Sequence, residues 1–123
     1  MANNSTRVEL KLPKDARAVA ALQVALQHLT QKAGLPAGAQ GGFVGAAESV
    51  CREAMHHLAE NNAALRVVVE KFSDRLEVTF EHPGEPLGMA PPPPEVDRVH
   101  AASQGGRSHL TLVKYFPVHS SER

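Results

Sequence analysis

The stretch of this sequence with the residue types best suited to chemistry is VCREAMHHL, which Ser49 directly precedes. Ser49, Glu53 and His57 recur every four residues, so a helix would place their side chains on one face. A hydroxyl, a carboxylate and an imidazole on one face could bind a metal ion. The plainer interpretation is the polar flank of a helix. The sequence favours it, because no tight zinc-ligand spacing is present.

Cys51 lies within the same stretch and is the one cysteine of the chain, which excludes an intramolecular disulfide. It falls on the apolar side of the helical pattern, so we expect a small buried side chain rather than a nucleophile. A single cysteine also fits a reducing compartment, and the first residues have no basic and apolar signal segment. These features predict a cytoplasmic protein.

The overall composition predicts a single globular domain with neither a nucleic-acid nor a membrane partner. The 123 residues suffice for one two-layer core, and the 42% hydrophobic content is ordinary for such a domain. Thirteen basic residues balance thirteen acidic ones, so no net charge attracts nucleic acid or an anionic membrane. No apolar run reaches the length that would span a membrane.

The elements that must position these residues are two helices and about five strands. Apolar residues every three or four positions predict helices over 16–33 and 42–58, with the glycine-rich residues 37–42 as a flexible turn. Alternating apolar residues predict strands over 8–12, 65–72, 75–81, 96–103 and 108–116. The order β-α-α-β-β-loop-β-β predicts an α/β (α+β) two-layer sandwich. In it, two long helices cover one face of a mixed or antiparallel sheet.

One domain is expected over residues 7–116, with a disordered N-terminus at 1–6 and a flexible tail at 117–123. Residues 82–95, HPGEPLGMAPPPPE, contain six of the nine prolines of the chain. Proline lacks a backbone donor and fixes φ, so this segment predicts an exposed loop that is partly polyproline II.

The order of elements and several words of the sequence resemble one branch of the GHKL (Bergerat-fold, histidine kinase-like) ATPases, the anti-sigma-factor serine/threonine kinases. The words are VELKLPKDARAVAALQVALQHLTQKAGL, VCREAMHHL, RLEVTFEHPGEP, VDRVHAAS and HLTLVKYF. The resemblance extends from Arg7 to Phe116. It implies a domain that binds ATP and magnesium and that contacts sigma factors or small anti-sigma antagonists, usually as a dimer.

The second helix departs from the family pattern at both of its reacting positions. In the family it carries a Glu that activates the attacking hydroxyl and, four residues later, an Asn that holds magnesium. The corresponding residues here are Ser49 and Glu53, and His57 falls where the family often has His. Serine cannot act as a general base without its own activator, although Glu53 could still ligate magnesium.

The adenine-binding motif and the phosphate lid depart from the family pattern as well. The family has an Asp before a Gly-x-Gly loop, whereas this chain has Phe80, then His82 at the first glycine position, and keeps Gly84. Phenylalanine cannot accept the hydrogen bond of the adenine amino group. The proline-rich residues 82–95 stand in place of the glycine-rich lid, so the resemblance implies the fold without the catalysis.

The first interpretation is therefore a catalytically degenerate, protein-binding regulatory module in bacterial signalling or transcription control. It has no catalytic residue, no metal and no cofactor, and its expected protein contacts are Arg52, Glu53 and His56. The partner would be a sigma factor, an anti-sigma antagonist or another signalling protein, and the assembly could include a homodimer. Enzymatic activity stays an open question at this stage.

Two other interpretations are kept. One is a divergent but active ATP-binding anti-sigma serine kinase, with Mg²⁺-ATP as its cofactor and Glu53 as a magnesium ligand. The other is a small-ligand sensor that reuses the vacated nucleotide pocket near Phe80 and Ala54, for which an enclosed apolar cavity would be the sign.

Overall fold

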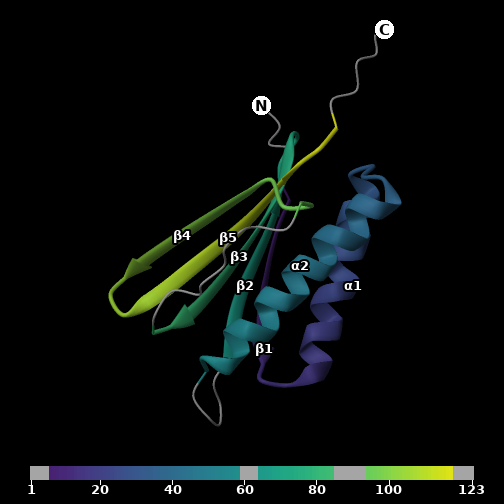
Figure 1. Cartoon of the computed structure of the whole chain (residues 1–123). Coiled ribbons are helices and arrows are strands. Elements are labelled where there is room, and N and C mark those ends of the chain that lie inside the picture. The colour runs from purple at the N-terminus through teal and green to yellow at the C-terminus, as the bar shows by residue number, and fades with distance from the viewer. Residues whose placement is uncertain (1–5, 59–63, 85–93, 118–123) are drawn as a thin grey trace, which may run out of the picture.

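The structure, a computed structural model, describes residues 6–58, 64–84 and 94–117. Its elements in chain order are β1 (Thr6–Pro13), α1 (Ala16–Lys32), α2 (Ala37–His56), β2 (Ala64–Lys71), β3 (Arg75–Pro83), β4 (Arg98–Gln104) and β5 (Arg107–Tyr115). Both helices lie on the same face of the sheet (Figure 1). The predicted two-layer sandwich and the predicted order of elements are thus confirmed.

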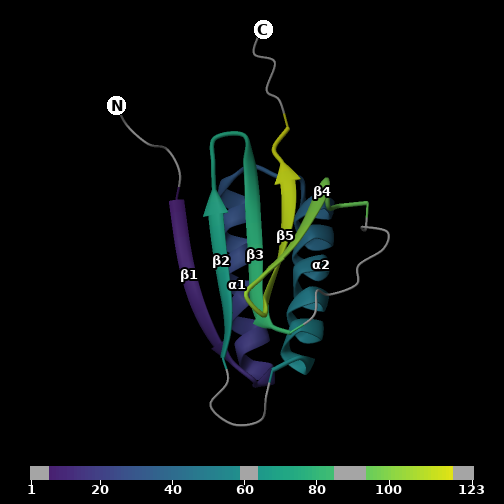
Figure 2. The same ribbon diagram turned by 90° about the vertical axis from the view of Figure 1, so that its left-hand side faces the viewer.

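The five strands form one sheet in the order β1-β2-β3-β5-β4, and every neighbouring pair is antiparallel (Figure 2). Of the two predicted kinds of sheet, the antiparallel one is therefore correct. Gly105 and Gly106 join β4 to β5 with φ values of +61° and +80°, which a tight two-residue hairpin requires.

The core lies between the sheet and the helices, where the predicted apolar residues of both layers meet. Val19, Leu22 and Leu26 of α1 are buried, and so are the alternating residues of the central strands. Asp15 caps α1, because its carboxylate accepts a hydrogen bond of 2.8 Å from the backbone N–H of Arg17. The inward residues of the central strands are Val67, Val69, Leu76, Val78 and Phe80.

Helix α2 begins at Ala37, so the predicted flexible turn over residues 37–42 is wrong. Pro36 occupies the N-cap position, and the first helical hydrogen bond runs from the N–H of Gln40 to the carbonyl of Pro36 at 2.9 Å. The side-chain amide of Gln40 also donates to the carbonyl of Leu35 at 2.7 Å. Burial of Phe43 in the core offsets the low helix propensity of the glycines in this turn.

Strand β3 continues to Pro83, so the predicted loop over 82–95 starts too early. His82 keeps the inward alternation of Leu76, Val78 and Phe80, and it is completely buried. At the other boundaries, β1 already includes Thr6 and β4 begins at Arg98 rather than at residue 96. Most of the proline-rich segment, residues 85–93, lies outside the described residues, as do 1–5 and 118–123.

Candidate functional site

The three residues that the four-residue spacing singled out lie on the exposed side of α2. Ser49 and Glu53 are exposed on the helix, and His57 is exposed at its C-cap position. The buried side of the same helix consists of apolar residues, with Ala47, Cys51 and Ala54 fully covered. The structure thus groups Ser49, Glu53 and His57 on a solvent-facing strip, as the spacing predicted.

Phe80, which the resemblance aligns with the adenine-reading position, points into the core rather than into an open pocket. It is 0% exposed and is paired across the sheet with Val67 on one side and Leu110 on the other, both of them buried. Ala54, across the layer in α2, is also fully buried and belongs to the same core cluster. Packed side chains therefore occupy this part of the molecule, which counts against a ligand sensor with a cavity there.

Gly84, which the resemblance aligns with a glycine of the adenine-binding motif, has a structural role here. Its φ of +89° lies in the left-handed region, where a side chain would be strained. Its N–H donates to the carbonyl of Gly106 at 2.9 Å, and its carbonyl accepts from the buried hydroxyl of Ser108 at 2.6 Å. These bonds fasten the end of β3 to the β4–β5 turn.

His82 is a buried polar residue whose environment the sequence did not indicate. Its Nδ1 lies 2.9 Å from the carbonyl of Pro83, so Nδ1 carries the proton and donates it. Its Nε2 is buried and has no hydrogen-bond partner among the described residues. The exposed ring of His57 lies over it, with the two ring centroids 5.3 Å apart. The alternation of apolar residues along β3 indicated that residue 82 would be buried, but the following Pro83 led to the prediction of a loop there.

Of the three predicted protein-contact residues, two line the same surface hollow and the third does not. Arg52 and His56 line a shallow hollow of about 240 Å³ between the end of α2 and the start of α1, whereas Glu53 does not. Arg52 also forms an ion pair of 2.7 Å with Glu48 one turn earlier. The remaining lining residues of the hollow are Lys14, Asp15, Ala16, Val19 and Met55. Only the packing of α1 on α2 brings these residues together, so spacing along the chain could not reveal the set.

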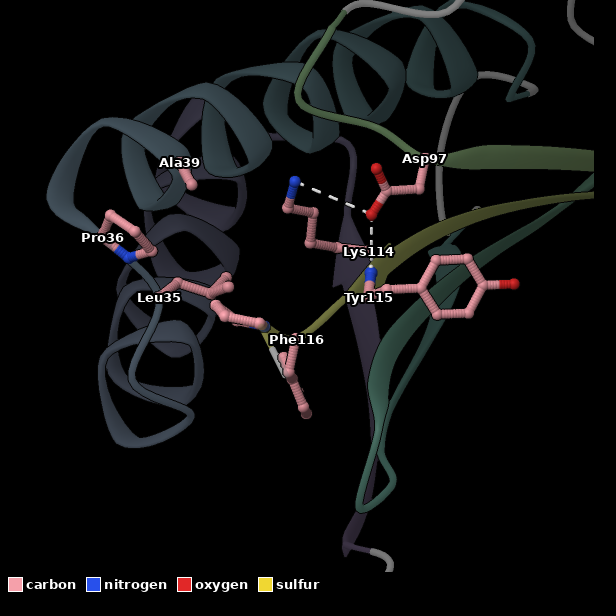
Figure 3. A pocket seen from close by; sticks show the side chains of 8 residues that line it. Leu35, Pro36, Ala39, Asp97, Lys114, Tyr115 and Phe116 are labelled. Atoms are coloured by element: carbon pink, nitrogen blue, oxygen red, sulfur yellow. Dashed lines mark hydrogen bonds and ion pairs between the residues drawn. The ribbon is translucent and has the colours of Figure 1, made fainter. Parts of the chain in front are cut away.

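A larger hollow of about 410 Å³ lies at the other end of α2 (Figure 3). Apolar side chains from the α1–α2 connection and from the end of β5 form most of its wall. Asp97 marks its polar rim, where its carboxylate accepts from the backbone N–H of Tyr115 at 2.7 Å and lies 3.7 Å from the Lys114 ammonium. The lining residues are Leu35, Pro36, Ala39, Asp97, Lys114, Tyr115, Phe116 and Pro117.

The outer face of the sheet, opposite the helices, carries a charge network centred on Glu81. Its carboxylate accepts from Arg66 at 2.6 Å and from Arg107 at 2.9 Å, and His109 lies 3.5 Å away. Burial alone would raise the pKa of Glu81, but the hydrogen bonds from Arg66 and Arg107 lower it below its usual value. Every charge in this group has an opposite partner, which is typical of a solvated sheet face.

Nucleophilic and metal chemistry find little support in the residues present. Cys51 is fully buried, and that burial raises the pKa of its thiol to about 11, so the reactive thiolate is disfavoured. Over residues 6–58, 64–84 and 94–117, no group of three or more His, Cys, Asp or Glu side chains is placed to hold a metal ion. Within the same ranges, no helix is both long and apolar enough to cross a membrane.

Among the comparisons with known proteins, the comparison with solved structures found matches. No protein-family model matches the sequence, and no curated protein matches it. Among solved structures, it is similar to the crystal structure of the RsbU and RsbW domains of Rv1364c from Mycobacterium tuberculosis, with a TM-score of 0.73 and 14% sequence identity. The match covers 91% of this chain and 33% of that one, so this chain spans about a third of the matched protein. At this identity the likeness shows a shared fold.

Proposed function

We propose that this domain is a catalytically degenerate relative of the anti-sigma-factor kinases that regulates by binding another protein. The observation that carries the proposal is the contrast between two sides of one helix. The inner side of α2 and the facing Phe80 are packed into the core, whereas the outer side presents Arg52, Glu53 and His56 to solvent. A fold can outlast the chemistry it once supported, because fold and site are separable.

The residues found at the positions that phosphotransfer would require support a loss of kinase activity. A general base must accept a proton from the attacking hydroxyl, and Ser49 offers a hydroxyl in its place. Magnesium requires about six oxygen ligands, of which protein carboxylates normally supply one or two beside the phosphates. Glu53 could supply one, but the adenine side of the site has the buried phenyl ring of Phe80 where a carboxylate is needed.

The RsbW domain in the structural neighbour supports the class of partner. RsbW is the kinase type that the sequence resembles, so the shared fold is consistent with a module of anti-sigma regulation. We propose a sigma factor or an anti-sigma antagonist as the partner, with another bacterial signalling protein as the broader class. Binding would occur in the cytoplasm, where such partners act.

We propose that the contact centres on the hollow between the start of α1 and the end of α2. It has an apolar floor that includes Val19 and Met55, and a rim of mixed charge at Lys14, Asp15 and Arg52. An apolar centre with a polar rim is the usual composition of a protein–protein contact. Arginine is also among the residues that contribute most to such contacts.

The test is capture of partners from native lysate by the full chain and by the variant Arg52→Ala/His56→Ala. The unaltered chain should retain a sigma factor or an anti-sigma antagonist, and the double variant should lose at least about 90% of it, since one hot-spot arginine is worth about 1.4 kcal/mol or more. Arg7→Ala/His28→Ala is the matched control, because it removes an exposed arginine and an exposed histidine elsewhere. Equal retention by all three chains, or no such partner at all, would contradict the proposal.

A further inference from the structure

Two histidines from different layers of the fold meet at one end of the molecule. His57 occupies the C-cap position of α2, and His82 is the next-to-last residue of β3. Both elements end on the same side of the domain (Figures 1 and 2). The centroids of the two rings lie 5.3 Å apart, and the ring planes are tilted by 48°. This tilt is neither a parallel stack nor an edge-to-face contact, so attraction between the rings does not by itself account for the pair.

The His82 ring has the arrangement of a metal-binding imidazole. Its Nδ1 lies 2.9 Å from the carbonyl oxygen of Pro83 and donates its proton there. Nε2 therefore keeps a free lone pair. Histidines that bind metal ions usually donate their other ring N–H to a carbonyl or a carboxylate, which fixes the tautomer and makes the ligand nitrogen more basic. The hydrogen bond to Pro83 has both effects on His82.

The Nε2 atom of His82 is the second observation that indicates a ligand. Across residues 6–58, 64–84 and 94–117, it is the one buried side-chain nitrogen or oxygen that has no hydrogen-bond partner. Such an atom has lost its contact with water without gaining another, which costs free energy. A lone pair accepts either a proton donor or a metal ion. The chemistry of this atom therefore selects a cationic ligand and excludes an anionic one.

We propose that His57 and His82 together bind one zinc ion, with Nε2 of His82 as one ligand and a ring nitrogen of His57 as the other. Zinc in proteins is tetrahedral with zinc–nitrogen bonds of about 2.0–2.1 Å, so two imidazoles on one zinc ion have centroids roughly 5 Å apart. The separation of 5.3 Å matches this value. Neighbouring imidazoles on a square-planar ion such as Cu²⁺ would be closer, at roughly 4.5 Å.

The exposed His57 gives the zinc ion a way in to the buried His82. Exposed side chains change rotamer within picoseconds to nanoseconds, so the His57 ring can turn outward, take up the ion and return. The described part of the chain has no group of three candidate metal ligands. Two protein ligands are therefore available, and water or a donor from outside completes the tetrahedron. In this the site differs from structural zinc sites, which have four protein ligands.

Zinc at this position would join the two layers of the sandwich. His57 belongs to the helical layer and His82 to the sheet, so the ion would hold the end of α2 against the end of β3. A ligand that binds the folded chain but not the unfolded chain increases the free energy of unfolding. Zinc should therefore raise the Tm. The site does not depend on the function proposed above, because that contact uses Arg52 and His56 rather than His57.

Calorimetric titration of the full chain with zinc chloride tests the proposal. The unaltered chain should bind one zinc ion, and His57→Ala should raise the dissociation constant at least ~10-fold, because it removes one of two protein ligands. His56→Ala is the matched control, since it removes an exposed histidine one residue away and should bind zinc as the unaltered chain does. Both replaced residues are exposed, so the variants should fold, and circular dichroism checks this.

Nitrogen-15 NMR of the histidine rings identifies the ligand atom. Without metal, His82 should show the tautomer with its proton on Nδ1. On addition of zinc, the resonance of its Nε2 should shift while Nδ1 keeps its proton. Thermal unfolding provides the matching energetic readout. Zinc should raise the Tm of the unaltered chain and of His56→Ala, and His57→Ala should lose most of that rise.

Three results would overturn the proposal. One is the absence of saturable zinc binding by the unaltered chain. Another is equal affinity of the unaltered chain and His57→Ala, which would place the ion on other side chains as an adventitious ligand. The last is an unchanged Nε2 resonance of His82 at saturating zinc.

Discussion

Phe80 and Gly84, which the resemblance aligns with motif positions of the anti-sigma-factor kinases, both have structural roles in this fold. Phe80 fills the core at the position where the resembled kinases have an adenine-binding carboxylate. Gly84 keeps a backbone conformation with φ of +89° and fastens β3 to the β4–β5 turn. The burial of Phe80 was predictable from its alternation with Val78, whereas the hydrogen bonds of Gly84 were not, because they join segments distant in sequence.

Cys51 provides a prediction at the same scale. Its folded-state pKa of about 11 exceeds the ordinary value of 9.0, so above pH 9 the unfolded chain releases a proton that the folded chain keeps. The free energy of unfolding should therefore fall between pH 9 and pH 11, by about 2 kcal/mol from this group. Urea denaturation of the unaltered chain and of Cys51→Ala at pH 8 and pH 10.5 checks it. The variant should lose less stability over this interval, and equal losses would contradict the prediction.

At the scale of elements, α2 illustrates where sequence reasoning succeeded and where it failed. Its apolar periodicity predicted a helix with one buried side, and Val44, Ala47, Cys51 and Leu58 lie on that side. Its first turn was predicted as a loop because three of residues 37–42 are glycine. Helix propensity is a weak prior, and burial of Phe43 outweighs it. The predicted third strand was too short for the same reason, because the proline at position 83 was interpreted as the start of a loop although β3 continues to Pro83.

Two neighbouring glycines of α2, Gly41 and Gly42, differ in the space available for a side chain. A Cβ at Gly42 would collide with the side chain of Glu95, whereas a Cβ at Gly41 would meet nothing within 4 Å. Gly41→Ala should stabilise the domain by up to about 1 kcal/mol through helix propensity. Gly42→Ala should instead destabilise it by roughly 1–3 kcal/mol through overpacking.

Urea denaturation of both alanine variants measures these differences. Adding Glu95→Gly to Gly42→Ala removes the colliding side chain and should restore most of the lost free energy of unfolding. A change in the helix propensity of α2 alone would not be reversed by this second substitution. If Gly42→Ala stabilised the domain as much as Gly41→Ala, the close approach of residue 95 to α2 would be refuted.

On the scale of the whole molecule, the fold was predictable and the surface was not. Periodicity along the chain was enough for the layers, the order of elements and most of the core. The set formed by Arg52, His56, Lys14 and Asp15 exists because the start of α1 packs beside the end of α2. The hollow at the other end of α2 likewise joins Leu35 to Phe116 across the chain. Such sets depend on tertiary packing, which no local pattern encodes.

We propose that the domain has the fold of a nucleotide-binding kinase without binding the nucleotide. Thermal unfolding of the full chain with and without Mg²⁺-ATP tests this claim most directly. A ligand present at a hundredfold excess over its dissociation constant would add about 2.7 kcal/mol to the free energy of unfolding. That corresponds to a rise in Tm of roughly 10 °C or more for a domain of this size. With Phe80 packed in the core, millimolar Mg²⁺-ATP should leave the Tm unchanged, and a clear, saturable rise in Tm would contradict the account.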